Sequence, residues 1–243
     1  MKKFSLQSAG KSQGRDLGVA KAMSMHKNYD FVVAPSKKTA EFYCEAFGCE
    51  KDKIVIASLP RVDVILDGKS RYDEFIELNP QYKNKKLITY LPTFRDGDFQ
   101  FAENLYEAFE NDAEYALVIS PHPLTKLKSE HKFNGNFSAY DLAKLSYGII
   151  SDYSATTLEC SLLNKPLWFY IPDYEKYKAE QGLNIDMTEE MGSASFIDES
   201  ELLKSVKSGI YDFDNLKRFS DKYIKNKGTD NTKILAGIIC NQL

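Results

Sequence analysis

Six short apolar runs along the chain predict β-strands. They are continuous rather than alternating, so we expect both faces of each strand to be buried. Strands of this kind are typical of a parallel sheet that carries helices on both faces. The six runs occupy residues 30–35, 53–58, 86–92, 115–120, 147–151 and 166–172.

Helical patterns lie between these runs and complete an alternation of strands and helices. We expect Ser36 to cap the first of these helices and Gly48 to end it. Residues 97–101 and 181–196 have the composition of loops. The alternation predicts an α/β fold with a Rossmann-like doubly wound parallel sheet that takes up the six strands. The predicted helices occupy residues 36–48, 101–111, 140–146 and 154–164, and further helices follow from residue 198.

The composition is that of an ordinary globular protein. The 243 residues are 43% hydrophobic and 28% charged, with a formal net charge of −3, which gives no reason to expect nucleic acid as a partner. No apolar run reaches the roughly 18 residues that a membrane-spanning helix needs. The first residues also lack the apolar core of a signal peptide. A cytoplasmic location is therefore expected.

The cysteines and histidines do not predict a metal site, and no cofactor is expected. The chain has three histidines and neither an HExxH nor a CxxC motif. Its cysteines lack metal-ligand spacing. Cys44 and Cys49 could approach each other on one helix, but isolated core thiols are the preferred expectation. The four cysteines are Cys44, Cys49, Cys160 and Cys240.

Residues 1–28 are expected to form a basic arm or helix, separate from a domain that occupies residues 29–243. Asp16 is the single acidic residue of this segment. Two interpretations stay open: a solvated surface helix, or a segment that contacts an anion or a membrane surface. The six basic residues are Lys2, Lys3, Lys11, Arg15, Lys21 and Lys27.

The residues that follow the predicted strands are candidates for a ligand site. In an open parallel sheet, ligands bind beyond the carboxyl ends of the strands. Several residues at these positions have side chains that can bind an anion. They are Ser36, Arg61, Thr93, Arg95, His122, Ser151 and Ser154.

The stretch from Ser151 to Glu159 joins a predicted strand to a predicted helix. Ser154 is a candidate helix cap, and a helix start offers free backbone N–H groups and a partial positive charge to a phosphate. Glu159 lies one to two turns into that helix, where its carboxylate could accept hydrogen bonds from ribose hydroxyls. The alternative is that Ser154 is only a cap and Glu159 only a surface residue.

Two further strand ends carry phosphate-binding chemistry. Thr93 offers a hydroxyl, and Arg95 offers a guanidinium fork that suits phosphate. His122 lies between two prolines, so its imidazole is expected to be held at the strand end as a general acid or a hydrogen-bond donor. The alternatives are a surface arginine on a turn and a histidine that is simply a satisfied polar group.

Several motifs in this order resemble the CDP-glycerol glycerophosphotransferase family, which contains the teichoic-acid polymerases and primases of bacterial cell walls. The resemblance runs from about residue 30 to residue 190. Its most specific part is the Asp-Tyr-Ser element followed by an acidic residue and a Lys-Pro strand. The matching segments are "DFVVAPSKKTAEFYCEAFGCEKDKIVIASLPRVD", "YLPTFRD", "HP", "IISDYSATTLE", "NKPLWFYIPDYEKY" and "QGLNID".

The resemblance implies a fold and a reaction. The fold would resemble the carboxyl-terminal, nucleotide-binding half of a GT-B glycosyltransferase, so residues 29–243 would bind the nucleotide donor. The donor would be CDP-glycerol or a related CDP-alditol. A hydroxyl of a lipid-linked polyol-phosphate or saccharide acceptor would attack the β-phosphate and release CMP, in teichoic-acid or capsule synthesis.

The resemblance also implies roles for individual residues. Thr93 and Arg95 would contact the donor pyrophosphate, together with Ser151, Asp152 and Ser154. His122 would hold the donor phosphate as the catalytic residue. Glu159 would meet the ribose, and Ser36 and Arg61 would contribute to nucleotide binding. Fixed donors of this kind are what a pyrophosphate leaving group needs where charge develops.

The sequence departs from the family pattern in three ways. It lacks the Trp-His-Gly or Trp-His-Ala motif, so the acceptor half and its catalytic histidine are expected to be absent. Asn136 stands where a second histidine is common, and Gln181 stands where arginine often precedes a glycine. Donor binding is therefore a firmer expectation than turnover, and a partner subunit could supply the missing half.

Two alternative functions follow from these departures. One is a nucleotide-binding subunit that does not catalyse. The other is a different GT-B enzyme that uses a sugar nucleotide, such as a sialyltransferase or an epimerase-like protein. In the transferase interpretation, the basic arm and the lipid-linked acceptor imply a peripheral position on the inner face of the plasma membrane.

Overall fold

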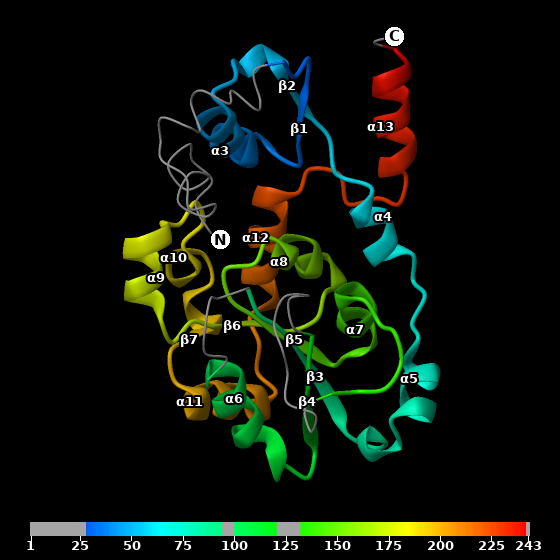
Figure 1. Ribbon diagram of the computed structural model, residues 1–243, viewed down its shortest axis with the longest axis vertical. Coiled ribbons are helices and arrows are strands. Elements are labelled where there is room, and N and C mark those ends of the chain that lie inside the picture. The colour runs from blue at the N-terminus through cyan, green and yellow to red at the C-terminus, as the bar shows by residue number, and fades with distance from the viewer. Residues whose placement is uncertain (1–27, 94–99, 121–131, 242–243) are drawn as a thin grey trace.

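The computed structural model describes residues 28–93, 100–120 and 132–241 (Figure 1). Within these residues the strands form two separate sheets, one of five strands and one of two. The larger sheet has the order β4-β3-β5-β6-β7, and all its neighbouring strands are parallel. Its strands are β3 (Lys86–Leu91), β4 (Tyr115–Ile119), β5 (Gly148–Ser151), β6 (Leu167–Tyr170) and β7 (Ser195–Phe196).

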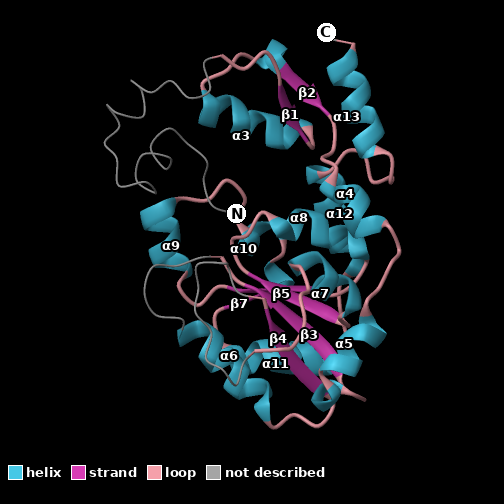
Figure 2. Ribbon diagram, turned by 45° about the vertical axis from the view of Figure 1, so that its right-hand side comes forward, coloured by secondary structure: helices cyan, strands magenta, loops and turns pink. Residues whose placement is uncertain are grey.

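Helices cover both faces of the five-stranded sheet (Figure 2). On one face, α6 (Gln100–Glu110) packs against β4 and against α11 (Glu199–Ser208). The Tyr170 hydroxyl of β6 donates a hydrogen bond to Glu199 of α11 at 3.1 Å. Phe169 points to the opposite face, because side chains alternate along a strand. There it packs edge-on against Phe219 of α12 (Phe213–Tyr223), with 6.4 Å between ring centroids.

The core explains the continuous apolar runs of the sequence. β4, β5 and β6 are buried at every position, and β3 is buried at every position except Lys86. A strand covered by helices on both faces has no water-facing side on which polar residues would alternate. The remaining helices are α4 (Arg61–Leu66), α5 (Tyr72–Leu78), α7 (Ala139–Leu145), α8 (Thr156–Cys160), α9 (Tyr174–Gln181), α10 (Met187–Glu190) and α13 (Asn231–Cys240).

The first two strands form a small sheet of their own. β1 (Val32–Ala34) and β2 (Ile54–Ile56) pair in parallel and are joined by α3 (Lys37–Phe47). Figure 1 shows this β1-α3-β2 unit set apart from the larger sheet. The expectation that all six predicted strands join one sheet is therefore wrong. An apolar run indicates that a segment is extended and buried, but it does not indicate its neighbour in the sheet.

All six predicted strands are confirmed as strands, and the fold class is confirmed as Rossmann-like α/β. The expectation that residues 181–196 form only loop is wrong. This segment contains α10 and β7, which adds the fifth strand to the larger sheet. Neither element has a clear apolar period, because α10 has four residues and β7 two. The basic arm predicted for residues 1–28 lies outside the described residues except for its last position.

Helix α3 begins and ends as the sequence predicts. The Ser36 side chain accepts a hydrogen bond from the backbone N–H of Thr39 at 3.1 Å and therefore caps the helix. Gly48 adopts φ of 62°, the left-handed conformation in which glycine commonly ends a helix. The local signals for this helix are therefore confirmed at both ends.

Helix α8 is shorter than predicted, and Ser154 is not its cap. The helix spans five residues from Thr156, its N-cap position is Ala155, and no side chain caps it. A 3₁₀ turn, Ser161–Leu163, follows directly. The dipole of so short a helix is small, so α8 by itself does not make the anion site that the sequence predicts here.

The cysteines differ from the expectation of core thiols. All four are free, and Cys160 alone among them is buried. Cys44 and Cys49 are half-buried, and Cys240 is exposed on α13. The expectation is therefore confirmed for Cys160 and wrong for the other three.

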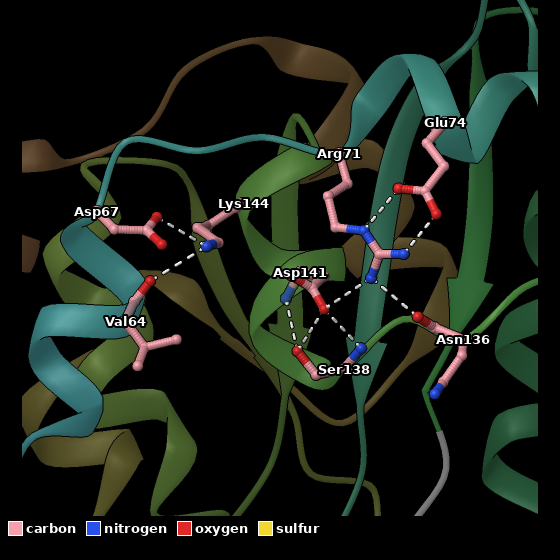
Figure 3. Close-up of polar contacts among 8 residues, drawn as sticks. All are labelled: Val64, Asp67, Arg71, Glu74, Asn136, Ser138, Asp141 and Lys144. Atoms are coloured by element: carbon pink, nitrogen blue, oxygen red, sulfur yellow. Dashed lines mark hydrogen bonds and ion pairs between the residues drawn. The ribbon is translucent and has the colours of Figure 1, made fainter.

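The segment between α4 and α5 is tied to α7 by two basic side chains (Figure 3). Lys144 of α7 donates to the carbonyl oxygen of Val64 at 3.1 Å and to Asp67 at 3.0 Å. Arg71 donates to Asp141 of α7 at 3.4 Å and to the carbonyl oxygen of Asn136 at 2.9 Å, and it pairs with Glu74 of α5. These contacts hold the segment between α4 and α5 against α7, a helix of the larger sheet.

Asp63 of α4 fixes the N-terminus of α13. Its carboxylate accepts hydrogen bonds from the backbone N–H and side-chain amide of Asn231 and from the backbone N–H and hydroxyl of Thr232, at 2.6–2.9 Å. Partial burial alone would raise the pKa of Asp63, but these four hydrogen bonds outweigh it and lower the pKa to about 2. Helix α13 is thereby joined to α4.

We expect Asp63→Ala to loosen α13. The substitution leaves the first N–H groups of the helix without an acceptor, and loss of a helix cap typically costs about 1 kcal/mol. Hydrogen exchange should therefore accelerate in residues 231–240, with a free energy of unfolding lower by a similar amount. Glu77→Ala, which removes an exposed carboxylate from α5, serves as the control. Unchanged exchange in α13 would show that Asp63 does not hold it.

Candidate functional site

The candidate site lies where the strand order of the larger sheet changes direction. The chain runs from β3 to β4 on one side of β3 and then returns to β5 on the other side. The loops after β3 and β5 therefore diverge at the carboxyl edge between these strands, which is where open α/β sheets bind ligands. Thr93 follows β3, and residues 152–154 follow β5, at this position.

Asp152 holds these two loops together. Its carboxylate accepts the backbone N–H of Thr93 at 2.9 and 3.0 Å and the Thr93 hydroxyl at 2.6 Å. Asp152 is wholly buried, so its charge is turned into the protein rather than toward a ligand. A carboxylate in this position fixes the direction in which the chain leaves β3.

Ser151 and Ser154 flank Asp152 and differ in exposure. Ser151 is wholly buried, and its hydroxyl donates to the carbonyl oxygen of Leu91 at 2.7 Å. Ser154 is half-buried, and its hydroxyl accepts the backbone N–H of Thr156 at 3.3 Å. Ser151 therefore stabilises the junction of the strands, while the Ser154 hydroxyl keeps its own hydrogen free to donate to a ligand.

Arg61 and Glu159, both predicted to meet the nucleotide, form an ion pair with each other. The Nε of Arg61 lies 3.4 Å from Oε1 of Glu159. Glu159 is 8% exposed, which excludes the interpretation that it is only a surface residue. Its second oxygen, Oε2, is buried and makes no hydrogen bond with the described part of the protein.

Two tyrosines accompany this ion pair. Tyr140 of α7 lies close enough to Arg61 and Glu159 for their charges to act on its hydroxyl. Tyr43 of α3 lies close enough to both Arg61 and Glu159 for their charges to act on its hydroxyl. The cluster therefore draws one side chain from each of α3, α4, α7 and α8, and it joins the small unit to the larger sheet's helices.

The carboxyl group of Glu159 is a weaker acid than that of an ordinary glutamate. Burial raises its pKa to about 7, and the charge of Arg61 opposes that rise only in part. Burial likewise raises the pKa of Tyr140 to about 12. A buried carboxyl group with a pKa near neutrality is typical of functional sites, although ion pairs with a structural role also occur.

The structure brings some of the predicted residues together and leaves others undetermined. Thr93, Ser151, Asp152 and Ser154 meet at the switch point, and Arg61 meets Glu159. Ser36 is buried, and its hydroxyl already bonds to the backbone and side chain of Thr39. Arg95 and His122 lie outside the described residues, so their convergence on this site stays a prediction.

Tyr140 and Tyr43 are site residues that the sequence does not reveal. Each is an aromatic residue in a predicted helix, where the sequence alone suggests no more than packing in the core. Their nearness to Glu159 depends on how α3 and α7 pack around α4 and α8. A half-buried tyrosine close to a candidate carboxylate is a recognisable signal only after the helices have been placed.

The described residues contain neither a candidate metal site nor a membrane-spanning helix. No group of three His, Cys, Asp or Glu residues in this part of the chain could hold a metal ion. The histidines at positions 26, 122 and 131 all lie outside it, so the expectation of no metal stays a prediction. Among the described helices, none combines the length and the hydropathy required to cross a bilayer.

The fold and this corner define an α/β protein with a Rossmann-like sheet and a candidate ligand site at its switch point. A family model described as CDP-glycerol:poly(glycerophosphate) glycerophosphotransferase matches residues 1–240. The chain belongs to this family. The resemblance inferred from the sequence motifs is therefore confirmed.

Curated relatives of the chain are enzymes of teichoic-acid synthesis. It is 28% identical over 268 residues to the teichoic acid ribitol-phosphate primase of Bacillus spizizenii, covering 100% of this chain and 67% of the relative. It is 24% identical to the teichoic acid glycerol-phosphate primase of Bacillus subtilis, covering 99% of this chain and 65% of the relative. The chain thus spans about two thirds of the length of these relatives.

Solved structures share the fold. The wall teichoic acid polymerase TagF superposes with a TM-score of 0.70 at 20% identity, covering 93% of this chain and 60% of that chain. A UDP complex of MnaA from S. aureus superposes with a TM-score of 0.60 at 17% identity, covering 98% of this chain and 67% of that chain. At these identities the similarity concerns the fold alone.

We expect Asp152→Asn to destabilise the protein and Thr93→Val to do so less. Asparagine offers one acceptor in place of two and points an N–H donor at the Thr93 backbone. Hydrogen bonds to a charged group contribute about 1.5–3 kcal/mol and a neutral one about 1 kcal/mol. Chemical denaturation should show losses in that order. Equal stability of Asp152→Asn and the parent protein would contradict the role of Asp152 as the bond between the loops.

Proposed function

We propose that this chain binds CDP-glycerol or a related CDP-alditol and transfers the alditol phosphate to an acceptor hydroxyl, as a transferase of teichoic-acid or capsule synthesis. The observation that carries the proposal is the ordered corner at the switch point, where Asp152 fixes the loop after β3 beside the loop after β5. Family membership and the functions of the curated relatives support it.

The donor pyrophosphate is assigned to this corner. The half-buried Ser154 hydroxyl can donate to a phosphate oxygen, and Thr93 begins the loop that carries Arg95. Ser151 and Asp152 support these loops from inside the protein. Asp152 directs both of its carboxylate oxygens to Thr93 and so holds the loop after β3 beside the loop after β5.

The nucleoside is assigned to the side of Glu159. Ribose carries two vicinal hydroxyls, which a carboxylate accepts well, and Oε2 of Glu159 has a free acceptor position. Arg61 stabilises the carboxylate and keeps further N–H donors for the nucleotide. Ser36, at the start of α3, completes the set of nucleotide-binding residues proposed here.

The proposed reaction is a phosphoryl-type transfer. An acceptor hydroxyl oxygen attacks the β-phosphorus of the donor, the pyrophosphate bond to CMP breaks, and CMP leaves with the bridging oxygen. His122 holds the donor phosphate as negative charge develops, and a base takes the hydroxyl proton. The chemistry needs fixed donors and positive charge rather than a redox cofactor.

The acceptor and its setting belong to the same proposal. A lipid-linked polyol-phosphate or saccharide would present its hydroxyl at the inner face of the plasma membrane, where the chain would be a peripheral protein. The match covers about two thirds of the relatives, so the remaining family segment, in the same polypeptide or in a partner, would complete acceptor binding. A subunit that binds the donor without turnover is the alternative.

Donor preference tests the proposal directly. Calorimetry should detect binding of CDP-glycerol or CDP-ribitol, but of neither CMP-sialic acid nor a UDP-sugar. Binding of a UDP-sugar alone would overturn the assignment. A second assay, CMP release with a lipid-linked acceptor, separates a transferase from a subunit that only binds the donor.

We expect Arg95→Ala to weaken binding of CDP-glycerol by at least several-fold. A charge-assisted hydrogen bond contributes about 1.5–3 kcal/mol, so loss of the guanidinium should be large enough to measure. Arg218→Ala, a change of the same kind on the exposed surface of α12, is the matched control. Equal affinity of the Arg95→Ala variant and the parent protein would remove Arg95 from the donor site.

A further inference from the structure

The loop after β5 is held from both neighbouring strands. Asp152 bonds to Thr93, which follows β3, whereas Tyr153 contacts the chain that follows β6. Tyr153 is 2% exposed, so its side chain supports the corner from inside the protein rather than facing solvent. The next residue is Ser154, whose hydroxyl is assigned to the donor pyrophosphate. The position of that hydroxyl therefore depends on how Tyr153 is held.

Tyr153 is fixed by two contacts with the start of α9. Its ring stacks on that of Tyr177, with 3.8 Å between ring centroids and 15° between the ring planes. Its hydroxyl donates a hydrogen bond to the carboxylate of Asp173, the N-cap residue of α9, at 3.0 Å. The stack sets the plane of the ring, and the directional hydrogen bond sets its rotation within that plane. Together they leave the Tyr153 side chain a single orientation.

Helix α9 in turn depends on Tyr153 for its attachment. Tyr177 is the one buried residue of this helix, and the others are half-buried or exposed. Asp186 accepts hydrogen bonds from Tyr174 at 2.6 Å and from Lys178 at 2.9 Å, but these tie α9 to the segment that follows it. Figures 1 and 2 show α9 at the periphery of the molecule. A helix that buries so little apolar surface opens locally at a low free-energy cost, so the Tyr153 contact matters for its stability.

We propose that Tyr153 is a positioning residue that couples the donor site to α9. It holds Ser154 in place for a donor phosphate, and donor binding in turn stabilises α9. This inference rests on the proposed function, because it takes the donor and the role of Ser154 from there. Coupling between two sites is reciprocal, so a contact through which α9 improves donor binding must also let the donor stabilise α9. Tyr153 acts through Ser154 and does not itself touch the donor.

The first experiment measures CDP-glycerol binding by calorimetry in Tyr153→Phe, which keeps the stacked ring and removes the hydroxyl. We expect binding to weaken about fivefold, the effect of losing a typical hydrogen bond. Tyr211→Phe is the matched control, since the Tyr211 hydroxyl donates to the carbonyl oxygen of Leu167 at 2.8 Å, at the opposite end of β6. The control should bind like the parent protein. Equal affinity of Tyr153→Phe and the parent would overturn the proposal.

A double-mutant cycle separates positioning from a general loosening of the protein. If Tyr153 acts through Ser154, the Tyr153→Phe change has nothing left to affect once the Ser154 hydroxyl is gone. The variant that combines Tyr153→Phe with Ser154→Ala should therefore bind CDP-glycerol as Ser154→Ala does alone. A purely structural role predicts that the two losses of affinity add. Additive losses would exclude the positioning role.

Hydrogen exchange tests the reciprocal effect on α9. Saturating CDP-glycerol should slow amide exchange in residues 174–181 of the parent protein and of Tyr211→Phe, because the bound donor holds Ser154 and, through Tyr153, the start of the helix. In Tyr153→Phe the slowing should be clearly smaller, since the hydroxyl that joins the loop to Asp173 is missing. Exchange in α9 that ignores the donor in the parent protein would contradict the coupling.

The outcomes separate this inference from the proposed function. If the parent protein does not bind CDP-glycerol, the proposed donor is wrong, and the role of Tyr153 falls with it. If the parent binds CDP-glycerol but Tyr153→Phe binds it equally well, the donor is right and the role of Tyr153 is wrong. The two failures therefore give different results.

Discussion

The organisation of the candidate site depends on one buried carboxylate. Asp152 leaves the end of β5 and accepts three hydrogen bonds from Thr93, which leaves the end of β3. The two strands are neighbours in the sheet, but their loops diverge at the switch point, so the polar bond between them fixes the corner. A buried charge of this kind is stable only because its partner groups are close and well oriented.

A second constraint relates the small unit to the larger sheet. The ion pair between Arg61 and Glu159, together with Tyr43 and Tyr140, joins helices that the chain separates by up to about a hundred residues. Asp63 joins α4 to α13 in a similar way. Helix α4 therefore contacts the β1-α3-β2 unit, the helices of the larger sheet and α13. Its residues serve both the architecture and the proposed chemistry.

The sequence predicted an element correctly where residues close together in the chain determine it. The ends of α3 follow from the hydroxyl of Ser36 and the left-handed conformation of Gly48, which neighbouring residues alone determine. Ser154 has an equally good capping side chain, but α8 begins two residues later, at Thr156, and the Ser154 hydroxyl accepts the N–H of that first residue instead. Residues 181–196 contain β7, whose two residues become a strand only because β6 provides an edge.

By itself the sequence determined the class of fold, the six strands, the ends of α3 and, through the Asp-Tyr-Ser motif, the family. Buried strands need apolar residues on both faces, so a continuous apolar segment indicates such a strand. Tertiary structure alone decided that β1 and β2 form a separate sheet, that Asp152 faces Thr93, and that Tyr140 lies close to Arg61 and Glu159. These outcomes depend on contacts between segments far apart in the chain, and the residues of one segment do not specify which other segment will approach it.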